Sequence, residues 1–407
     1  MDPAIFPPAI VLACAGAPHG ALNAVRSLGL KGVPVHVVTE GQAPAVESSR
    51  HVVASWRIEG FSKDPNGFIK VVEGVANLSG RRPVIIPTAD PDLSVLMQTK
   101  DALSGICEMA IPDPALGLLL MDKGRFAHAA ESLGLPVPAT RMPRHEGDLQ
   151  GIATELSFPV IAKPANPNNW RPQEVEGLSW STKAIRLESG EDLINMGGEL
   201  IRRGNPLVVQ EFIPGKDLEH VDLHAHIDRR GNITGIFTGR KWRLFPPHAG
   251  SGCLAQSEYL PDVIELGLDC LRKLGYRGLA NLNFKRHEGT GKYWLLEINP
   301  RLSQWHILTT RCGVNLPWLA YSDAAGLCSS PSLTQDCGKW YLNFAEDRKA
   351  FRQYYREGSI GIKAYAASLC RPWQTVYQQW SWVDPVPAMA SLVDKIRRRV
   401  VQRLPPS

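Results

Sequence analysis

"KYWLLEINPRLSQW", residues 292–305, is the stretch from which the fold of this chain can be predicted. Apolar and aromatic residues run up to Glu297, and Asn299 and Arg301 follow at intervals of two. Side chains two apart on a strand point to the same face, so we expect these three to lie side by side. A carboxylate, an amide and a guanidinium at the end of a buried strand suit a functional site, and a solvated strand end is the alternative.

The preceding segment, "LANLNFKRH" (residues 279–287), has the alternating pattern of a strand. The glycine-containing "EGTGK" joins it to the first stretch, so the two are predicted to form a hairpin. Asn283 would then lie opposite Glu297 and Asn299. Oxygen ligands of this kind suit Mg²⁺, which completes its shell with waters and phosphate oxygens. Arg301 is suited to hold a phosphate by two parallel hydrogen bonds.

Three lysines lie on three other predicted elements. Lys163 closes the apolar strand "FPVIAK", Lys123 opens a helix in "MDKGRF", and Lys241 lies in the strand "FTGRKWRLF". Lysines that converge from separate elements can bind a polyphosphate, although each alone could be an ordinary surface side chain with a partly buried stem.

The segment "VVQEFIPGKDLEH", residues 208–220, leaves a buried strand in an extended conformation. Its exposed backbone groups are suited to bind the edge of an adenine, and the acidic residues just beyond are suited to bond ribose hydroxyls. An ordinary strand-to-turn exit would have a similar pattern.

Taken together and in this order, the motifs resemble the ATP-grasp superfamily. The resemblance covers about residues 9–325, and its most specific parts are "LLEINPR", "VVQEFIPG" and "FPVIAKPA". The chain is most similar to single-chain carboxylate–amine ligases related to the carbamoyl-phosphate synthase large subunit and to D-aspartate ligase.

The resemblance implies that ATP and Mg²⁺ are the cofactors and gives each motif a role. The implied ATP-binding residues are Lys123, Lys163, Gln210, Glu211, Phe212, Ile213, Asp217 and Glu219. The implied metal ligands are Asn283, Glu297 and Asn299. The implied catalytic residues are Arg301, Lys241 and Arg240.

The sequence departs from the superfamily's pattern in two places. Asn283 stands where Asp or Glu is common, and an amide oxygen adds no negative charge to the metal site. The loop expected to cover the phosphates, residues 165–183, contains only one glycine, Gly177, and two bulky residues, Trp170 and Trp180.

The implied reaction is ATP-driven joining of a carboxylate to an amine, as in ligases of the EC 6.3 type. The carboxylate would attack the γ-phosphate to give an acyl phosphate and ADP, and the amine would then displace phosphate. A thiol acceptor, or a weakened ATP-binding regulatory module, is the alternative.

Substrate contacts are predicted from the segments that adjoin these motifs. Polar residues follow the strand of Lys241 and the strand of Glu297 and Asn299. His19 lies in the loop after the first strand, where open α/β sheets bind ligands. Core packing is an equal alternative for Trp305. The candidate substrate residues are Arg243, His248, Ser303, Trp305, His306 and His19.

The fold class expected is α/β and α+β, with an N-terminal Rossmann-like (pre-ATP-grasp) domain, a two-lobed ATP-grasp fold and a helical C-terminal tail. A strand, a glycine turn, a helix and a second strand occupy residues 9–40, which is a βαβ pattern. The expected divisions are the pre-ATP-grasp domain (1–115), the small lobe with its linker helix (116–215), the central lobe (216–329) and the helical region (330–407).

The bulk properties are those of a soluble globular protein. Of the 407 residues, 44% are hydrophobic and 21% charged, and the net charge of +5 does not call for nucleic acid. The eight scattered cysteines favour a reducing compartment, so we expect a cytoplasmic protein. We also expect a homodimer as one option for its assembly.

The tail ends in "SLVDKIRRRVVQRL", residues 391–404, which has the pattern of a basic amphipathic helix. Such a helix can lie on an anionic membrane. Packing of its apolar face on the rest of the protein is the alternative that the sequence favours.

Overall fold

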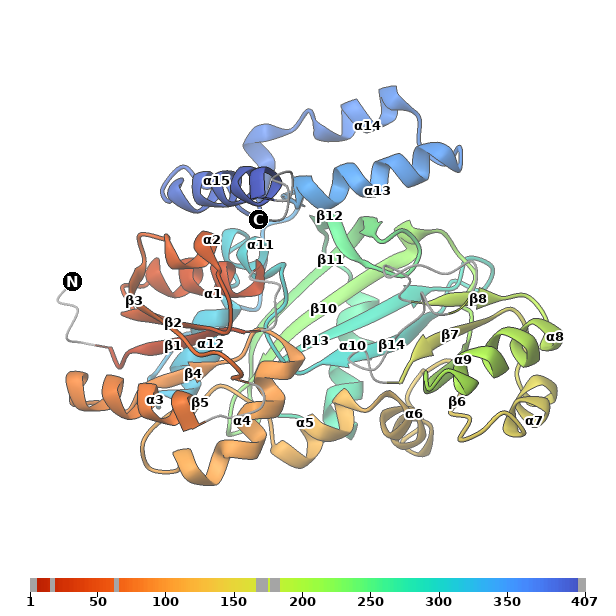
Figure 1. The fold of residues 1–407 in the computed structure, drawn as a ribbon, viewed down its shortest axis with the longest axis horizontal. Coiled ribbons are helices and arrows are strands. Elements are labelled where there is room, and N and C mark those ends of the chain that lie inside the picture. Colours follow the sequence, from red (N-terminus) through yellow and green to blue (C-terminus); the bar gives the residue numbers. More distant parts are fainter. Residues whose placement is uncertain (1–5, 15–18, 62–65, 166–174, 176–183, 402–407) are drawn as a thin grey trace.

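The computed structural model describes residues 6–14, 19–61, 66–165, 175 and 184–401. It contains three sheets that follow one another along the chain. Figure 1 shows the N-terminal sheet at one end, the large central sheet beside it and the small sheet at the other end. The expected fold class is confirmed by this arrangement, whereas the exact domain limits remain a prediction.

The N-terminal sheet is parallel and has the strand order β3-β2-β1-β4-β5. Alternate residues of β1 enter two different cores, Val11 on one face and Leu12 on the other, as expected for a parallel sheet covered on both faces. The strands are β1 (Ala9–Ala13), β2 (Val35–Thr39), β3 (Val52–Arg57), β4 (Val84–Ile86) and β5 (Glu108–Met109). The helices are α1 (His19–Gly29), α2 (Pro44–Glu47), α3 (Asn66–Ser79) and α4 (Asp90–Leu103).

Two consecutive helices, α5 (Pro114–Met121) and α6 (Lys123–Ser132), connect the N-terminal sheet to the small sheet. Asp122 separates them, because its side chain accepts hydrogen bonds from the backbone N–H groups of Gly124 (3.1 Å) and Arg125 (2.9 Å). An N-cap of this kind starts a new helix. It makes Lys123 the first residue of α6.

The small sheet has the order β6-β9-β7-β8, with helices packed on it. Its strands are β6 (Thr140–Arg141), β7 (Val160–Pro164), β8 (Ile185–Leu187) and β9 (Leu207–Glu211). Its helices are α7 (Asp148–Glu155), α8 (Gly190–Asp192) and α9 (Gly198–Arg202), the last two joined by the π-helical segment η3 (Leu193–Gly197).

The central sheet has the order β14-β13-β10-β11-β12-β15-β16. Its strands are β10 (His220–Ile227), β11 (Ile233–Phe245), β12 (Ser251–Ser257), β13 (Gly278–Arg286), β14 (Tyr293–Asn299), β15 (Trp340–Leu342) and β16 (Thr375–Tyr377), and the 3-10 helix η4 (Asp217–Glu219) precedes β10. One face packs on α10 (Pro261–Lys273). The other shares a core with the N-terminal sheet through α11 (His306–Arg311) and α12 (Leu316–Ala324).

The C-terminal region is mainly helical, as expected, but it also adds β15 and β16 to the central sheet. Its helices are α13 (Phe344–Arg356), α14 (Ile362–Leu369) and α15 (Val386–Val401), with the short 3-10 helix η5 (Pro372–Gln374) before β16. Figure 1 shows these three helices as a layer on one side of the molecule. No helix in the described part of the chain has both the length and the apolar character needed to span a bilayer.

Candidate active site

One cavity lies where the small sheet, α6 and the end of β14 meet. Its lining comes from the small sheet, from α6 and from β14. Asp90 of α4, in the N-terminal unit, adds a carboxylate. Five residues singled out in the sequence lie here together, namely Lys123, Lys163, Gln210, Glu297 and Asn299. Their roles remain predictions, but the chain brings them to one place.

The hairpin of β13 and β14 has the predicted pairing. Asn283 lies opposite Glu297, and Asn281 lies opposite Asn299. The Asn299 Nδ2 donates a hydrogen bond to the Glu297 Oε1 at 3.1 Å. The carboxylate and amide expected to bind a metal therefore lie side by side at the end of the strand.

Two lysines line the same cavity and lie close enough to this carboxylate to act on its charge. The Lys163 Nζ donates to the Gln210 Oε1 (2.9 Å), and the Lys123 Nζ donates to the carbonyl of Pro164 (3.3 Å). Burial lowers the pKa of Lys163 to about 8. Burial alone would raise the pKa of Glu297, but the charges of Lys123 and Lys163 outweigh it and hold that pKa below its usual value. Glu297 is therefore ionised at neutral pH.

Lys241 has a buried acidic partner that sequence reasoning missed. Its Nζ lies 2.9 Å from the Asp222 Oδ1 and also donates a hydrogen bond to the Asn283 Oδ1. Asp222 is paired directly with Asn283 across β10 and β13. Burial raises the pKa of Asp222 to about 6, although the charge of Lys241 opposes this. A carboxylate therefore stands next to the position where Asn283 supplies only an amide.

The donor set fits one Mg²⁺ that is shared with a nucleotide. In the described part of the chain no three His, Cys, Asp or Glu residues form a metal-binding group. Glu297 would contribute the charge and Asn299 an amide oxygen, which is few ligands from the protein. Asn283 does not line this cavity, and its amide oxygen accepts a hydrogen bond from Lys241, so its part in the metal site stays a prediction. Mg²⁺ is commonly held in this way, by one or two carboxylates with waters and substrate phosphates.

Arg301 extends from the end of β14 towards the N-terminal unit. Its guanidinium lies 2.5 Å from the Asp90 Oδ1, and it donates a second bond to the Asn299 Oδ1 at 3.2 Å. Asp90, the first residue of α4, was not singled out in the sequence. The arginine is thus held beside the metal residues by an acid from another sheet.

The end of β9 and the extended segment after it contain the residues predicted to bind adenine. The ring of Phe212 lies between two cations, with Arg186 at 4.4 Å and the Lys285 Nζ at 4.3 Å from its centroid. Burial lowers the pKa of Lys285 to about 8. The Glu211 Oε1 accepts a hydrogen bond from the backbone of Ser157 (2.8 Å), and Ile213 is buried.

The two acids predicted to bind ribose have protein partners in this structure. Asp217 accepts hydrogen bonds from the backbone N–H of His248 (3.0 Å) and from the hydroxyl of Tyr354. Glu219 lies 3.7 Å from Arg286. His248 therefore lies with Asp217, a predicted nucleotide residue, rather than with a separate substrate site.

Two arginines on β11 are fully engaged elsewhere. Arg240 forms a two-pronged ion pair with Glu258, at 2.7 and 2.9 Å. Arg243 forms another with Asp347 of α13, at 2.6 and 3.0 Å, and both side chains are buried. Neither arginine lines the Lys163–Glu297 cavity, so the catalytic role predicted for Arg240 and the substrate role predicted for Arg243 gain no support.

The substrate candidates after β14 lie mostly in the core. Trp305 belongs to the core shared with the N-terminal sheet, and its Nε1 donates to the carbonyl of Gly252 (3.2 Å). His306 is fully buried beside His224, with 3.3 Å between ring nitrogens. Ser303 is also buried. Core packing, the alternative considered for Trp305, therefore describes these positions better than substrate contact.

Two further predictions lie outside the described residues. The phosphate-covering loop, with Trp170, Gly177 and Trp180, is one of them. The side chain of His19, which opens α1, is the other.

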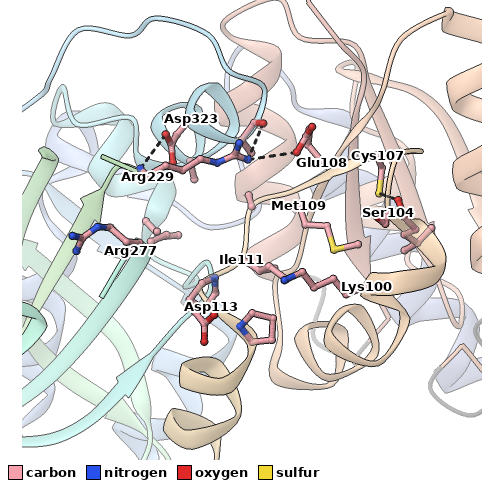
Figure 2. A pocket seen from close by; sticks show the side chains of 18 of the residues that line it. Lys100, Ser104, Cys107, Glu108, Met109, Ile111, Asp113, Arg229, Arg277 and Asp323 are labelled. Carbon is pink, nitrogen blue, oxygen red and sulfur yellow. Dashed lines mark hydrogen bonds and ion pairs between the residues drawn. The ribbon is translucent and has the colours of Figure 1, made fainter. Parts of the chain in front are cut away.

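A larger cavity lies away from this cluster, between β5, α12 and the β10–β11 turn. Figure 2 shows the side chain of Arg229 reaching from Asp323 towards Glu108. Glu108 lies 3.1 Å from Arg82 and 3.5 Å from Arg229, whose backbone N–H donates to Asp323 at 3.3 Å. We place the active site at the smaller cavity, because lysines, a carboxylate and amides singled out in the sequence line that one.

Comparison with known proteins agrees with this geometry. The family model described as "ATP-grasp in the biosynthetic pathway with Ter operon" matches residues 204–339. D-aspartate ligase from Enterococcus faecium is 27% identical over 315 residues, which is 74% of this chain and 74% of that protein. D-alanine–D-alanine ligase from Ectopseudomonas mendocina is 26% identical over 212 residues, 49% of this chain and 62% of that protein.

Solved structures show the same fold. A biotin carboxylase domain from Hydrogenobacter thermophilus, in complex with MgADP, ADP and bicarbonate, superposes with a TM-score of 0.61 at 15% identity, covering 81% of this chain and 72% of that one. The L-amino acid ligase from Bacillus licheniformis gives 0.57 at 14% identity, covering 79% and 74%. The chain therefore has the same fold as these enzymes. The family match and the similarity to D-aspartate ligase confirm the resemblance to ATP-grasp ligases seen in the sequence.

Proposed function

We propose that this chain is an ATP-dependent carboxylate–amine ligase. The observation that carries the proposal is the Lys123–Lys163–Glu297–Asn299 cluster, which places two cations opposite a carboxylate–amide pair in one cavity. This arrangement suits a nucleotide polyphosphate and its cation. The similarity to D-aspartate ligase, D-alanine–D-alanine ligase and L-amino acid ligase supports ligation as the reaction.

In the first step, an oxygen of the substrate carboxylate attacks the γ-phosphorus of ATP, and the bond to the ADP oxygen breaks. Lys163 and Lys123 neutralise the phosphate charge, and Arg301 stabilises the charge on the transferred phosphoryl group. Glu297, Asn299 and Asn283 would hold Mg²⁺, which when bound supplies further charge neutralisation.

In the second step, the nitrogen of an amine attacks the acyl carbon, and the bond to the phosphate oxygen breaks. An amide and inorganic phosphate result, and the amine loses its proton to solvent. Asp222 keeps Lys241 in place through the 2.9 Å ion pair, so that its ammonium stays beside Asn283. No residue of the chain needs to form a covalent bond.

We propose a small amino acid as the first substrate class to test. D-aspartate is the leading example, because its ligase is similar to this chain over 74% of both. A thiol acceptor and a weakened regulatory module remain the alternatives.

ATP as a substrate and eight cysteines without disulfides support a cytoplasmic location. A homodimer remains a proposal for the assembly. The membrane contact suggested by the tail involves the outer face of α15 and is independent of ligase activity.

The test is a matrix of D- and L-amino acids and small carboxylates, offered in pairs with amines and with ATP and Mg²⁺. ADP release is measured and each product is identified by mass spectrometry. We expect one pair to stimulate ADP release and yield an amide, and Glu297→Ala to abolish both. Glu288→Ala, an exposed position in the turn of the same hairpin, is the matched control. Equal ATP hydrolysis by wild type and Glu297→Ala with every pair would overturn the proposal.

A further inference from the structure

Helix α15 packs on the protein with its polar side and turns its apolar side outward. Met389, Leu392, Val393 and Ile396 follow the i, i+3, i+4, i+7 spacing of one helix face. They are 61%, 60%, 65% and 53% exposed. This is the reverse of the packing that the sequence favours for an amphipathic helix.

The opposite side of α15 makes the contacts with the rest of the chain. Pro387 and Ser391 are buried, Asp394 is half-buried, and the three are spaced i, i+4, i+7 on one face. The helix packs through this side against α2 of the N-terminal unit. The contacts that orient α15 are therefore made by its other side, and its apolar side stays exposed to solvent.

The segment before α15 is anchored by a buried ion pair. Asp384 lies 3.0 Å from the Arg26 Nε, and both side chains are almost fully buried. The carboxylate also accepts hydrogen bonds from the Ser49 hydroxyl (2.7 Å) and the Arg50 backbone (3.0 Å). These bonds fix the start of the helix to α1 and to the residues after α2. The outward direction of the apolar face is therefore set by buried contacts.

Further apolar side chains lie just before this face. Trp382 is 79% exposed, and Val383 and Val386 are about half exposed. Trp380 contacts Trp382 edge-to-face at 5.4 Å. Tryptophan is favoured at membrane–water interfaces because its ring is apolar and its N–H is polar.

Basic residues border the apolar face on both sides. With 3.6 residues per turn, Lys395 falls at one edge of the face and Arg397 at the other. Both are exposed, and Arg398, also exposed, pairs with Asp394 at 2.9 Å. An apolar stripe between cationic edges is complementary to acyl chains beneath anionic headgroups, and this is the arrangement of helices that lie in the membrane interface.

We propose that α15 and the preceding tryptophans form a docking surface for anionic lipid bilayers. The helix lies parallel to the bilayer, with Leu392 and Ile396 inserted below the headgroups and Lys395 and Arg397 at their level. The rest of the protein stays in water. The contact is peripheral and reversible, and it weakens as salt is added.

The test is co-sedimentation of the full chain with vesicles of phosphatidylcholine alone or with 30–40% phosphatidylglycerol, about the range that gives a strongly negative surface. We expect binding to the anionic vesicles and a blue shift of tryptophan fluorescence. Leu392→Ser/Ile396→Ser should weaken binding at least about tenfold. Leu78→Ser, at a site 87% exposed on α3, is the matched control and should bind like wild type.

A second variant, Lys395→Gln/Arg397→Gln, should lower binding several-fold and reduce its salt dependence. Since all four substituted side chains are exposed, the melting temperature should not change. Equal binding to both vesicle types, or no loss in the Leu392/Ile396 variant, would overturn the proposal. So would a dimer in light scattering that this variant dissociates while vesicles fail to bind, because the face would then cover a second copy.

Discussion

Two arginine–carboxylate pairs of this chain have the same chemistry but differ in their surroundings. Arg301 and Asp90 join the central sheet to the N-terminal unit, with side chains 21% and 48% exposed. Arg243 and Asp347 join β11 to α13, with side chains 4% and 0% exposed. One pair lies at a cavity that solvent reaches, and the other is sealed in the interior.

From this difference in exposure we infer that the Arg301 pair serves the proposed reaction and the Arg243 pair serves stability. A charge in an open site can exchange its partner for a ligand, so Arg301 can turn from Asp90 to a phosphate. A buried charge cannot exchange its protein partner for a ligand in this way. Loss of the partner leaves it unpaired in a medium of low dielectric constant. Substitutions should therefore affect activity at one pair and stability at the other.

The largest expected effect is on stability. Arg243→Met leaves Asp347 buried without its partner and should lower the free energy of unfolding by about 3–5 kcal/mol. Urea denaturation followed by circular dichroism measures it. Arg243→Met/Asp347→Leu, which removes both charges, should recover much of the loss. A single variant as stable as wild type would show that the pair is not structural.

Next comes the effect on turnover at the open pair. Arg301→Met should lower kcat about 10²–10³-fold, because a donor to the transferred phosphoryl group is lost. Its unfolding free energy should stay within about 1 kcal/mol of wild type, since the pair is partly exposed. Steady-state kinetics of ADP release provide the measurement. A large loss of stability with unchanged kcat would reverse the roles assigned to the two pairs.

The smallest expected effect is the pH dependence of ATP-analogue binding, which depends on Lys163 in the open site. The pKa of Lys163 is about 8 in the free protein because of burial, and a bound polyphosphate favours the charged form and raises it. ATP-analogue affinity is therefore full below pH 8 and falls as pH rises through about 8, by at most about tenfold per pH unit.

Calorimetry in buffers of different ionisation enthalpy measures the accompanying proton uptake. Lys163→Met should bind more weakly with a flatter pH profile, and Lys292→Met, an exposed lysine next to β14, should keep the wild-type slope. An unchanged slope in Lys163→Met would mean that this lysine does not face the phosphates.

Much of the site follows from local patterns. The alternation along β13 and β14 predicts that Asn283 faces Glu297, because side chains on a strand repeat every two residues. The same pattern predicts which strand ends carry Lys163 and Gln210. These positions depend on neighbours in the sequence, so the sequence contains enough information to place them.

Asp222 and Asp90 could not be found in this way. Asp222 reaches Asn283 through pairing of β10 with β13, whose register is set by the sheet as a whole. Asp90 reaches Arg301 across 211 residues of sequence. The alternation of polar and apolar residues in "HVDLHAHI", with one acid among them, was the available signal for Asp222, since an acid in a buried strand needs a partner.

The surroundings of Arg243 and the orientation of α15 could not be predicted either, because both depend on residues far away in the sequence. A polar residue in a strand has the same pattern whether it faces a ligand or a buried partner, and Asp347 lies 104 residues away. The amphipathic pattern of α15 gives an apolar face but not its direction, which Asp384 and Arg26 decide at a separation of 358 residues.

Transfer of oxygen from the substrate carboxylate to phosphate tests the central claim most directly. The substrate pair found by the ADP-release matrix is offered with ¹⁸O in its carboxylate, and the released phosphate is analysed by mass spectrometry. An acyl phosphate intermediate predicts one ¹⁸O atom in each phosphate, because the carboxylate oxygen that attacks ATP leaves with the phosphate. Unlabelled phosphate, formed at the same rate as ADP, would contradict ligation through an acyl phosphate.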